Sequence, residues 1–276
     1  MGDSGETQGS YLSEGDYERD SDYIDDRITL GARKPDHGPV GGDLWPVEPG
    51  RYRLVGALAC PWATRSIIVR QLLGLEDVIS LGRCGPTHDE RSWTFDLDPD
   101  GRDPVLGIER LQEAYLARFP DYTKGITVPA VVDIPTGQVV TNDFPWITHD
   151  LFVEWRDHHR PDAPDLWPDD VRDEMDDVME RVYTEVNNGV YRCGFAGSQE
   201  AYDAAYDRLF ATLDWLEERL TDRRYLMGEA ITEANSATPT RPGPAGWAAA
   251  TPGPDTDVGE SDEHPVRPRG RARPRT

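Results

Sequence analysis

Residues 51–75 read RYRLVGALACPWATRSIIVRQLLGL, and this stretch decides the fold. Its first ten residues predict a strand, and residues 61–75 predict an amphipathic helix because apolar side chains recur on one side. Pro61 stands in the first turn of that helix, where proline is preferred because its missing N–H would be unpaired in any case. Cys60 therefore lies at the junction between a strand and a helix.

The following residues continue this alternation. Further segments of the same two kinds come in order: strands at 77–84, 126–133 and 137–143, and helices at 107–118 and 147–159. The last two strands flank Pro135-Thr136-Gly137, which is a hairpin signal. The order strand, helix, strand, helix, strand, strand, helix is that of a thioredoxin-like α/β domain with a mixed sheet. We predict this domain over residues 45–160.

From residue 161 onward the pattern becomes helical. Residues 169–191 predict a helix that ends at Gly189. Residues 198–220 predict a longer helix with Ser198 as its N-cap and apolar residues at spacings of three and four. An all-α second domain is therefore expected over residues 161–235.

The composition changes at both ends of the chain. Residues 1–44 are acidic and rich in Gly, Ser and Asp, and they predict a largely extended segment. Residues 236–276 hold 8 of the 23 prolines and no Leu, Ile, Phe, Tyr, Met or Cys, which predicts a disordered tail. The change follows Thr232-Glu-Ala-Asn235, an N-cap signature that should open a buried helix. We therefore expect an incomplete helical domain, as a shifted reading frame would produce.

The net charge of −23 excludes two classes of partner. Nucleic acids and anionic membranes bind through lysine and arginine, and an acidic surface repels both. Lys34 and Lys124 are the only lysines in the sequence, which indicates a halophilic protein; an acidic product of a GC-rich gene is the alternative. The acidic start lacks the apolar region of a secretory signal, and no apolar run is long enough to span a membrane, so a cytoplasmic location is expected.

Three cysteines are present, Cys60, Cys84 and Cys193, and this odd number argues against a disulfide framework. None of them has the spacing of zinc ligands, so no metal site is predicted. At a helix start, unpaired N–H groups and the helix dipole stabilise a thiolate, and Arg65 one turn onward is expected to add positive potential. Position 63 is alanine, so Cys60 has no neighbouring thiol and needs an external one. The alternative is a small buried apolar residue.

Read together, several motifs carry a family resemblance. ALACPWATR (57–65) resembles the ACPWAHR signature of the glutathionyl-hydroquinone reductases, the xi class of glutathione transferases. VNNGVYRCGFAGSQEAYD (186–203) is similar to that family's NNGVYKxGFAxxQxxY stretch. ITVPAVVD and YLMGEAITEAN match further blocks in order, and the resemblance covers roughly residues 45–235. It implies a thioredoxin-like domain followed by the all-α domain of a glutathione transferase.

The resemblance also implies an activity. Members of the family reduce glutathionyl-hydroquinones: the cysteine, here Cys60, attacks the glutathione sulfur and forms a mixed disulfide that a second thiol resolves. Tyr191 matches the family's proton-donating tyrosine, a general-acid task. Glutathione is then a co-substrate, and the other partner is a quinone-derived thioether; no cofactor stays bound. The family forms homodimers, and an incomplete helical domain would remove much of that interface.

The same resemblance places the glutathione site at Trp93, Val128, Asp143 and Phe144. Val128 precedes a proline that is cis in this fold, so its backbone can pair with the bound peptide as an added strand. Asp143 and Phe144 stand where the family has Glu-Ser, so Asp143 can bind an ammonium group while Phe144 offers only its backbone N–H. Gly125 replaces a family arginine, which makes γ-glutamylcysteine or another small thiol an alternative to glutathione.

Two other functions stay open at this level. An omega-like thiol transferase acting on dehydroascorbate or protein mixed disulfides would use Cys60 without needing Tyr191. A truncated, inactive remnant would show no cooperative thermal transition.

Overall fold

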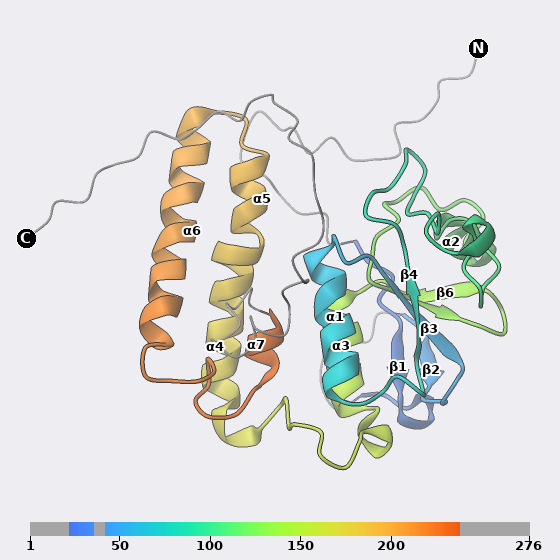
Figure 1. Cartoon of the computed structure of the whole chain (residues 1–276), viewed down its shortest axis with the longest axis horizontal. Helices are drawn as coiled ribbons and strands as arrows, with labels where there is room; N and C mark the ends of the chain where they lie inside the picture. Colours follow the sequence, from blue (N-terminus) through green and yellow to red (C-terminus); the bar gives the residue numbers. More distant parts are fainter. Residues whose placement is uncertain (1–21, 36–41, 238–276) are drawn as a thin grey trace, which may run out of the picture. The chain divides into compact units, whose positions relative to one another are not determined.

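The computed structural model describes residues 22–35 and 42–237 of the chain (Figure 1). Of the extended segment predicted for residues 1–44, residues 1–21 and 36–41 lie outside the described residues. The tail predicted for residues 236–276 lies outside them from residue 238 onward, and its first two residues, Ser236 and Ala237, are helical.

A four-stranded mixed sheet forms the centre of the N-terminal domain, in the order β4-β3-β5-β6. The strands are β3 (Tyr52–Gly56), β4 (Ser80–Arg83), β5 (Ala130–Asp133) and β6 (Gln138–Thr141). β3 runs parallel to β4 and antiparallel to β5, which in turn pairs antiparallel with β6. With α1 (Pro61–Leu72), α2 (Gln112–Arg118) and α3 (Phe144–Val153), this is the predicted thioredoxin-like arrangement.

Alternating side chains explain how the helices cover the sheet. Successive residues of a strand point to opposite faces. Leu54 and Val131 belong to the apolar cluster that includes α1 and α3, whereas Val55 and Val132 belong to the cluster that includes α2. The two faces are therefore both buried, each under its own helices.

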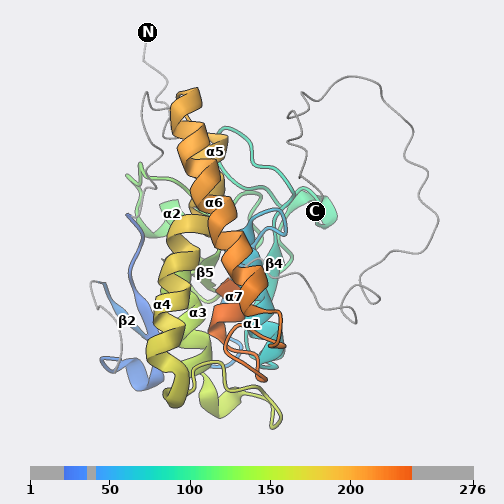
Figure 2. The same ribbon diagram turned by 90° about the vertical axis from the view of Figure 1, so that its left-hand side faces the viewer.

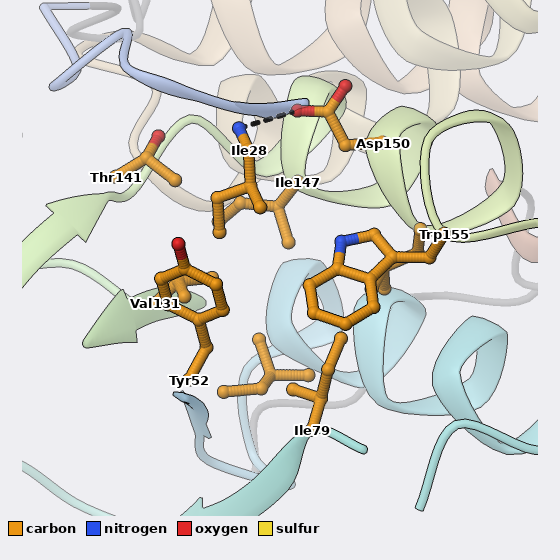
Figure 3. A pocket seen from close by; sticks show the side chains of 10 residues that line it. Ile28, Tyr52, Ile79, Val131, Thr141, Ile147, Asp150 and Trp155 are labelled. Atoms are coloured by element: carbon orange, nitrogen blue, oxygen red, sulfur yellow. Dashed lines mark hydrogen bonds between the residues drawn. The ribbon is translucent and has the colours of Figure 1, made fainter. Parts of the chain in front are cut away.

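The cluster under α1 and α3 contains a cavity of about 20 Å³ (Figure 3). Tyr52 and Trp155 face each other across it, with ring centroids 6.1 Å apart and nearly perpendicular planes. The Ile28 N–H donates to Asp150 at its edge. A space of this size holds no substrate, and it lies in the core rather than beside a reactive group.

The start of the described chain is fastened to this domain. β1 (Arg27–Thr29) and β2 (Leu44–Pro46) form a two-stranded parallel sheet. Arg27 Nε donates to Asp150 Oδ2 of α3 at 2.9 Å, and the Ile24 N–H donates to Asn142 Oδ1 at 2.7 Å. The sequence predicted the domain from residue 45, and the described residues 22–35 pack against the same folded body.

The second part of the chain is all-α, as predicted (Figure 1, Figure 2). It consists of α4 (Arg172–Val182), the π-helical turn η5 (Tyr183–Asn187), α5 (Gly189–Gly194), α6 (Gln199–Arg219) and α7 (Glu233–Ala237). Its core contains Met175, Val178 and Leu216. Ser198 caps α6, because its hydroxyl accepts the Ala201 N–H at 3.1 Å. Short 3₁₀ turns occur at Leu30–Ala32, Pro99–Gly101, Arg156–His158 and Asp169–Val171.

Several predicted boundaries were wrong. The strand predicted over residues 51–60 ends at Gly56. The helix predicted from residue 107 begins at Gln112, because the Glu113 carboxylate accepts the N–H groups of Glu109 and Arg110 and holds them in a turn. The helix predicted to end at Gly189 continues through a π turn and α5 to Gly194.

The described residues show one of the two hydrogen bonds expected of the capping box predicted at Thr232. Asn235 Oδ1 accepts the Thr232 N–H at 3.2 Å, which is the reciprocal bond of a capping box. Within the part of the chain that is described, the Thr232 hydroxyl is buried and has no hydrogen-bond partner. The buried helix that this cap opens, α7, is described as far as Ala237. No helix among the described residues has the length and apolar character needed to cross a bilayer.

Candidate active site

Cys60 lies where the sequence placed it, as the N-cap of α1. Its carbonyl accepts the first helical bond, from the Thr64 N–H at 3.0 Å. Its thiol is half-buried and donates to the Val128 carbonyl, with Sγ 3.4 Å from the oxygen. At a helix start, the first N–H groups and the helix dipole favour a thiolate.

Val128 and Trp93 lie beside the same apolar cluster as Cys60. The Val128–Pro129 peptide bond is cis, as predicted. Trp93 is partly buried, and its carbonyl accepts the Leu111 N–H at 3.0 Å. Val128 is therefore in direct contact with the Cys60 thiol, and Trp93 packs against the same apolar cluster.

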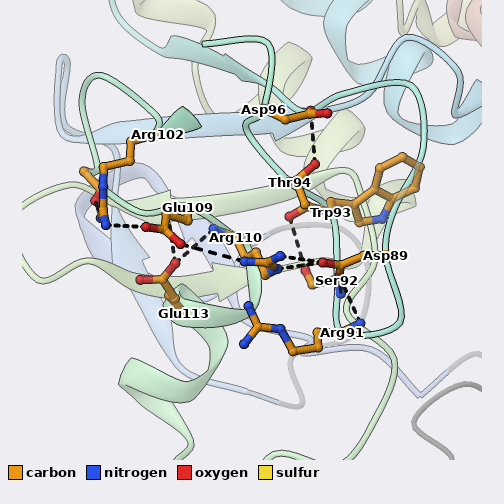
Figure 4. A network of polar contacts seen from close by, with 11 residues as sticks. Asp89, Arg91, Ser92, Trp93, Thr94, Asp96, Arg102, Glu109, Arg110 and Glu113 are labelled. Carbon is orange, nitrogen blue, oxygen red and sulfur yellow. Dashed lines mark hydrogen bonds and ion pairs between the residues drawn. The ribbon is translucent and has the colours of Figure 1, made fainter. Parts of the chain in front are cut away.

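A polar network holds the loop that carries Trp93 (Figure 4). The Asp89 carboxylate accepts the Ser92 N–H at 2.9 Å and two N–H groups of the Arg110 guanidinium, the shorter at 2.6 Å. This pairing holds the pKa of Asp89 well below its usual range. The His88 ring packs edge-on against Trp93 with centroids 5.2 Å apart. An ion pair and a ring contact thus fix the loop that carries Trp93.

Tyr191 reaches the site from the helical domain. Its phenol oxygen accepts the Trp62 Nε1–H at 3.0 Å, which joins α5 to the first turn of α1. Trp62 is 7% exposed and packs against Phe144 with ring centroids 4.4 Å apart and against Tyr183 at 6.0 Å. The phenol predicted to act as proton donor is therefore hydrogen-bonded to Trp62, which follows Cys60 by two residues in the sequence.

The π turn explains why Tyr183 and Tyr191 both face Trp62. Residues eight apart on a regular α-helix point in directions about 80° apart. A π turn takes up one extra residue, so these two behave as residues seven apart and differ by only about 20°. Both rings lie within 6.4 Å of the Trp62 ring. Neither the π turn nor the part played by Trp62 was predicted from the sequence.

Asp143 and Phe144 open α3 at the side of the site. Asp143 is the N-cap of the helix, and burial raises the pKa of its carboxyl to about 6. The Phe144 side chain is 4% exposed and lies between the Tyr23 ring and the Trp62 ring. Phe144 is therefore a packing residue through its side chain, and only its backbone is available for a ligand.

A cavity of about 500 Å³ adjoins the start of α1. Its walls are mostly apolar and come from α1, the π turn with α5, and α7: Leu58, Ala59, Pro61, Trp62, Thr64, Arg65, Ile68, Val186, Asn187, Val190, Ser236 and Ala237. Arg65 is paired with Glu233 of α7. The expectation that Arg65 adds positive potential beside Cys60 was therefore wrong, because a carboxylate balances its charge.

The other two cysteines differ in environment from Cys60. Cys84 is buried, and burial together with nearby aspartates raises the pKa of its thiol to about 12. Burial also raises the pKa of Cys193. None of the three forms a disulfide bond among the described residues. In residues 22–35 and 42–237, no group of three His, Cys, Asp or Glu side chains is arranged to hold a metal ion.

A thioredoxin-like domain followed by an all-α domain defines the fold of a glutathione transferase. Family models agree: residues 59–151 match the glutathione S-transferase N-terminal domain, and residues 199–234 match the C-terminal domain.

Similar proteins indicate which class of glutathione transferases this chain resembles. The chain is 42% identical over 192 residues to the glutathionyl-hydroquinone reductase PcpF of Sphingobium chlorophenolicum, covering 68% of this chain and 60% of PcpF. It is 65% identical to a glutathione transferase from Gordonia bronchialis, with a TM-score of 0.73, covering 78% of this chain and 64% of that one. It is 35% identical to the glutathione S-transferase Xi from Phanerochaete chrysosporium, with a TM-score of 0.70, covering 80% and 72%.

The chain belongs to the Xi class of glutathione transferases, the family that includes the glutathionyl-hydroquinone reductases. It spans about three fifths of the length of the curated relative PcpF.

Proposed function

We propose that this chain reduces glutathionyl-hydroquinones to hydroquinones through a Cys60–glutathione mixed disulfide. The observation that carries the proposal is the 3.0 Å hydrogen bond from Trp62 to Tyr191, because it ties a phenol to the helix turn that Cys60 caps. This reaction needs a nucleophilic thiol and a proton donor. Cys60 begins α1, and Tyr191 of α5 is hydrogen-bonded to the first turn of the same helix. The name of the relative PcpF supports the same reaction.

The chemistry proceeds in two exchanges. The Cys60 thiolate attacks the glutathione sulfur of the substrate, the carbon–sulfur bond breaks, and its electron pair passes to the ring carbon, which takes a proton from Tyr191. Free hydroquinone leaves, and Cys60 stays bound to glutathione. A second glutathione thiolate then attacks the bound glutathione sulfur, releases glutathione disulfide and returns the Cys60 thiolate. The proton of the second thiol restores Tyr191, so glutathionyl-hydroquinone and glutathione become hydroquinone and glutathione disulfide.

Four residues are proposed to hold the glutathione part of the substrate. Val128 offers its backbone at the cis bond beside Cys60, and Trp93 packs along the peptide. Asp143 binds the ammonium group of the γ-glutamyl unit, and Phe144 offers its backbone N–H to the carboxylate at the start of α3.

We also propose that the protein is cytoplasmic. Cysteines that form no disulfide, and a reaction that consumes a thiol, both fit a reducing compartment.

Intact-mass measurement after mixing the protein with a glutathionyl-hydroquinone tests the reaction. We expect a glutathione adduct and an equal amount of free hydroquinone, and neither with Cys60→Ser. Tyr191→Phe should slow hydroquinone release by about 10²-fold or more, as loss of a general acid does. Tyr202→Phe, on the exposed side of α6, is the matched control. Full activity of Tyr191→Phe would instead favour an omega-like thiol transferase.

The identity of the small thiol that resolves the Cys60 mixed disulfide is a separate question. Gly125 has no side chain to hold a glycine carboxylate, and a Cβ at this position would meet the Thr127 methyl group at 3.8 Å. We propose that γ-glutamylcysteine also serves as the resolving thiol. Second-order rates for reduction of the Cys60 mixed disulfide by both thiols decide the matter, and a clear preference for glutathione would contradict it.

A further inference from the structure

We infer that Trp62 is a positioning residue that sets the direction of the Tyr191 phenol and stabilises the phenolate left when Tyr191 gives up its proton. This inference rests on the proposed function, in which Tyr191 is the proton donor. The carrying observation is the hydrogen bond in which Trp62 Nε1 donates to the Tyr191 oxygen at 3.0 Å. The two residues lie 129 positions apart in the sequence and come from different domains.

The direction of this bond has a chemical consequence. An indole N–H can only donate, so the Tyr191 proton is not shared with Trp62 and is directed to another acceptor. When Tyr191 gives up that proton, its oxygen becomes a phenolate. A donor that stays bonded to the oxygen stabilises this phenolate as it forms. Trp62 thus favours the transfer of a proton to the leaving carbon or ring oxygen.

The indole is held rigidly enough to do this. Three aromatic rings from three elements surround it: Phe144 at the start of α3, Tyr183 of the π turn and Tyr191 of α5. Trp62 is also the second residue of α1, directly after the proline that follows Cys60. The same helical turn therefore fixes the nucleophile and the holder of the acid, and the spacing between them is set by α1.

Trp62→Phe tests this role because it keeps an aromatic ring and removes the N–H. In single-turnover reactions with a saturating glutathionyl-hydroquinone, we expect hydroquinone release to slow about tenfold, the worth of one hydrogen bond in the transition state. Alkylation of Cys60 by iodoacetamide should keep its rate. Trp167→Phe is the control: Trp167 Nε1 is buried and has no hydrogen-bond partner among the described residues.

A double variant separates this inference from the proposed function. If Trp62 acts through Tyr191, Trp62→Phe/Tyr191→Phe is no slower than Tyr191→Phe alone. Multiplied losses in the double variant, or an unchanged rate of hydroquinone release in Trp62→Phe, would overturn the role of Trp62. An unchanged rate in Tyr191→Phe would instead overturn the proposed function.

Replacement of Trp62 by 3-benzothienylalanine, which has sulfur in place of the N–H at nearly the same volume, gives a second test if the phenylalanine variant folds poorly. The same tenfold loss is expected from this analogue, and wild-type kinetics with it would also overturn the inference.

Discussion

Arg65 in the second turn of α1 forms a buried ion pair with Glu233, the first residue of α7. Their side chains are 9% and 1% exposed. Glu233 also accepts the Ser236 hydroxyl, at 3.0 Å. The helix that carries Cys60 is thus joined by charge to the helical domain.

Removal of one partner of this pair should be costly. We expect Glu233→Ala to lower the free energy of unfolding by about 3–5 kcal/mol, because Arg65 is left as an uncompensated buried charge. Urea denaturation measures the loss. Glu109→Ala is the control: the Arg102–Glu109 pair is 49% exposed on both sides, and its loss should cost less than about 1 kcal/mol. Similar losses in the two variants would contradict the role given to burial.

The three thiols should react at different rates. At pH 8 we expect iodoacetamide to modify Cys60 long before Cys84 in the native protein, because the pKa of the buried Cys84 thiol is raised to about 12. Peptide mapping over time measures each rate. After denaturation in urea all three cysteines should react alike. Native-state labelling of Cys84 as fast as that of Cys60 would show that burial does not protect it.

Ligand affinity should depend on the charge of Asp143. Burial raises its pKa to about 6, so the carboxyl is ionised above that pH and neutral below it. If it binds the ammonium group of a γ-glutamyl unit, the Kd of S-methylglutathione for Cys60→Ser should rise about tenfold from pH 7 to pH 5. Calorimetric titration measures this. The added Asp143→Asn change should give weak, pH-independent binding, and a flat profile with Asp143 intact would refute its proposed contact.

The same carboxyl affects stability in a defined direction. Its folded pKa lies above the unfolded value of 3.8, so the folded state holds the proton more tightly. The resulting stabilisation is complete below about pH 3.8 and is lost as the pH rises through about 6. We therefore expect Asp143→Asn to be more stable than the wild type at pH 8 in urea denaturation, and equal or lower stability would count against this pKa.

Salt should stabilise the protein. The net charge of −23 opposes the compact state through self-repulsion, and the Debye length falls to about 3 Å in 1 M salt. We propose that the protein is halophilic and expect the Tm to rise by at least about 4 °C between 0.05 and 1 M KCl, equivalent to about 1–2 kcal/mol. A matched osmolality of glucose controls for solvent exclusion. A Tm that falls or stays level with KCl would contradict the expectation.

The sequence predicted those features that depend on neighbouring residues. Ser198 is a cap because its hydroxyl meets an N–H three residues away, and Cys60 begins a helix because Pro61 follows it. The order of strands and helices was readable for the same reason. The start of α3 was predicted three residues late, although Pro145 in its first turn was an available signal.

The missed features depend on contacts between distant residues or on one inserted residue. Nothing around Trp62 in the sequence indicates that it meets Tyr191, because their contact is created by the packing of two domains. The π turn at Tyr183–Asn187 has no local signature, and Gly189 suggested an end where the helix continues. The packing of the Phe144 side chain on Trp62 was not predicted either, because it also joins residues far apart in the sequence.

The attachment of β1 has a consequence for the order of events during synthesis. Ile24 bonds to Asn142 across 118 positions, and Arg27 bonds to Asp150 across 123. This segment leaves the ribosome early, yet it has no docking surface until α3 has been made, and at about 5–20 residues per second that takes at least several seconds. During that interval Ile24 and Ile28, both buried in the finished fold, are open to chaperones.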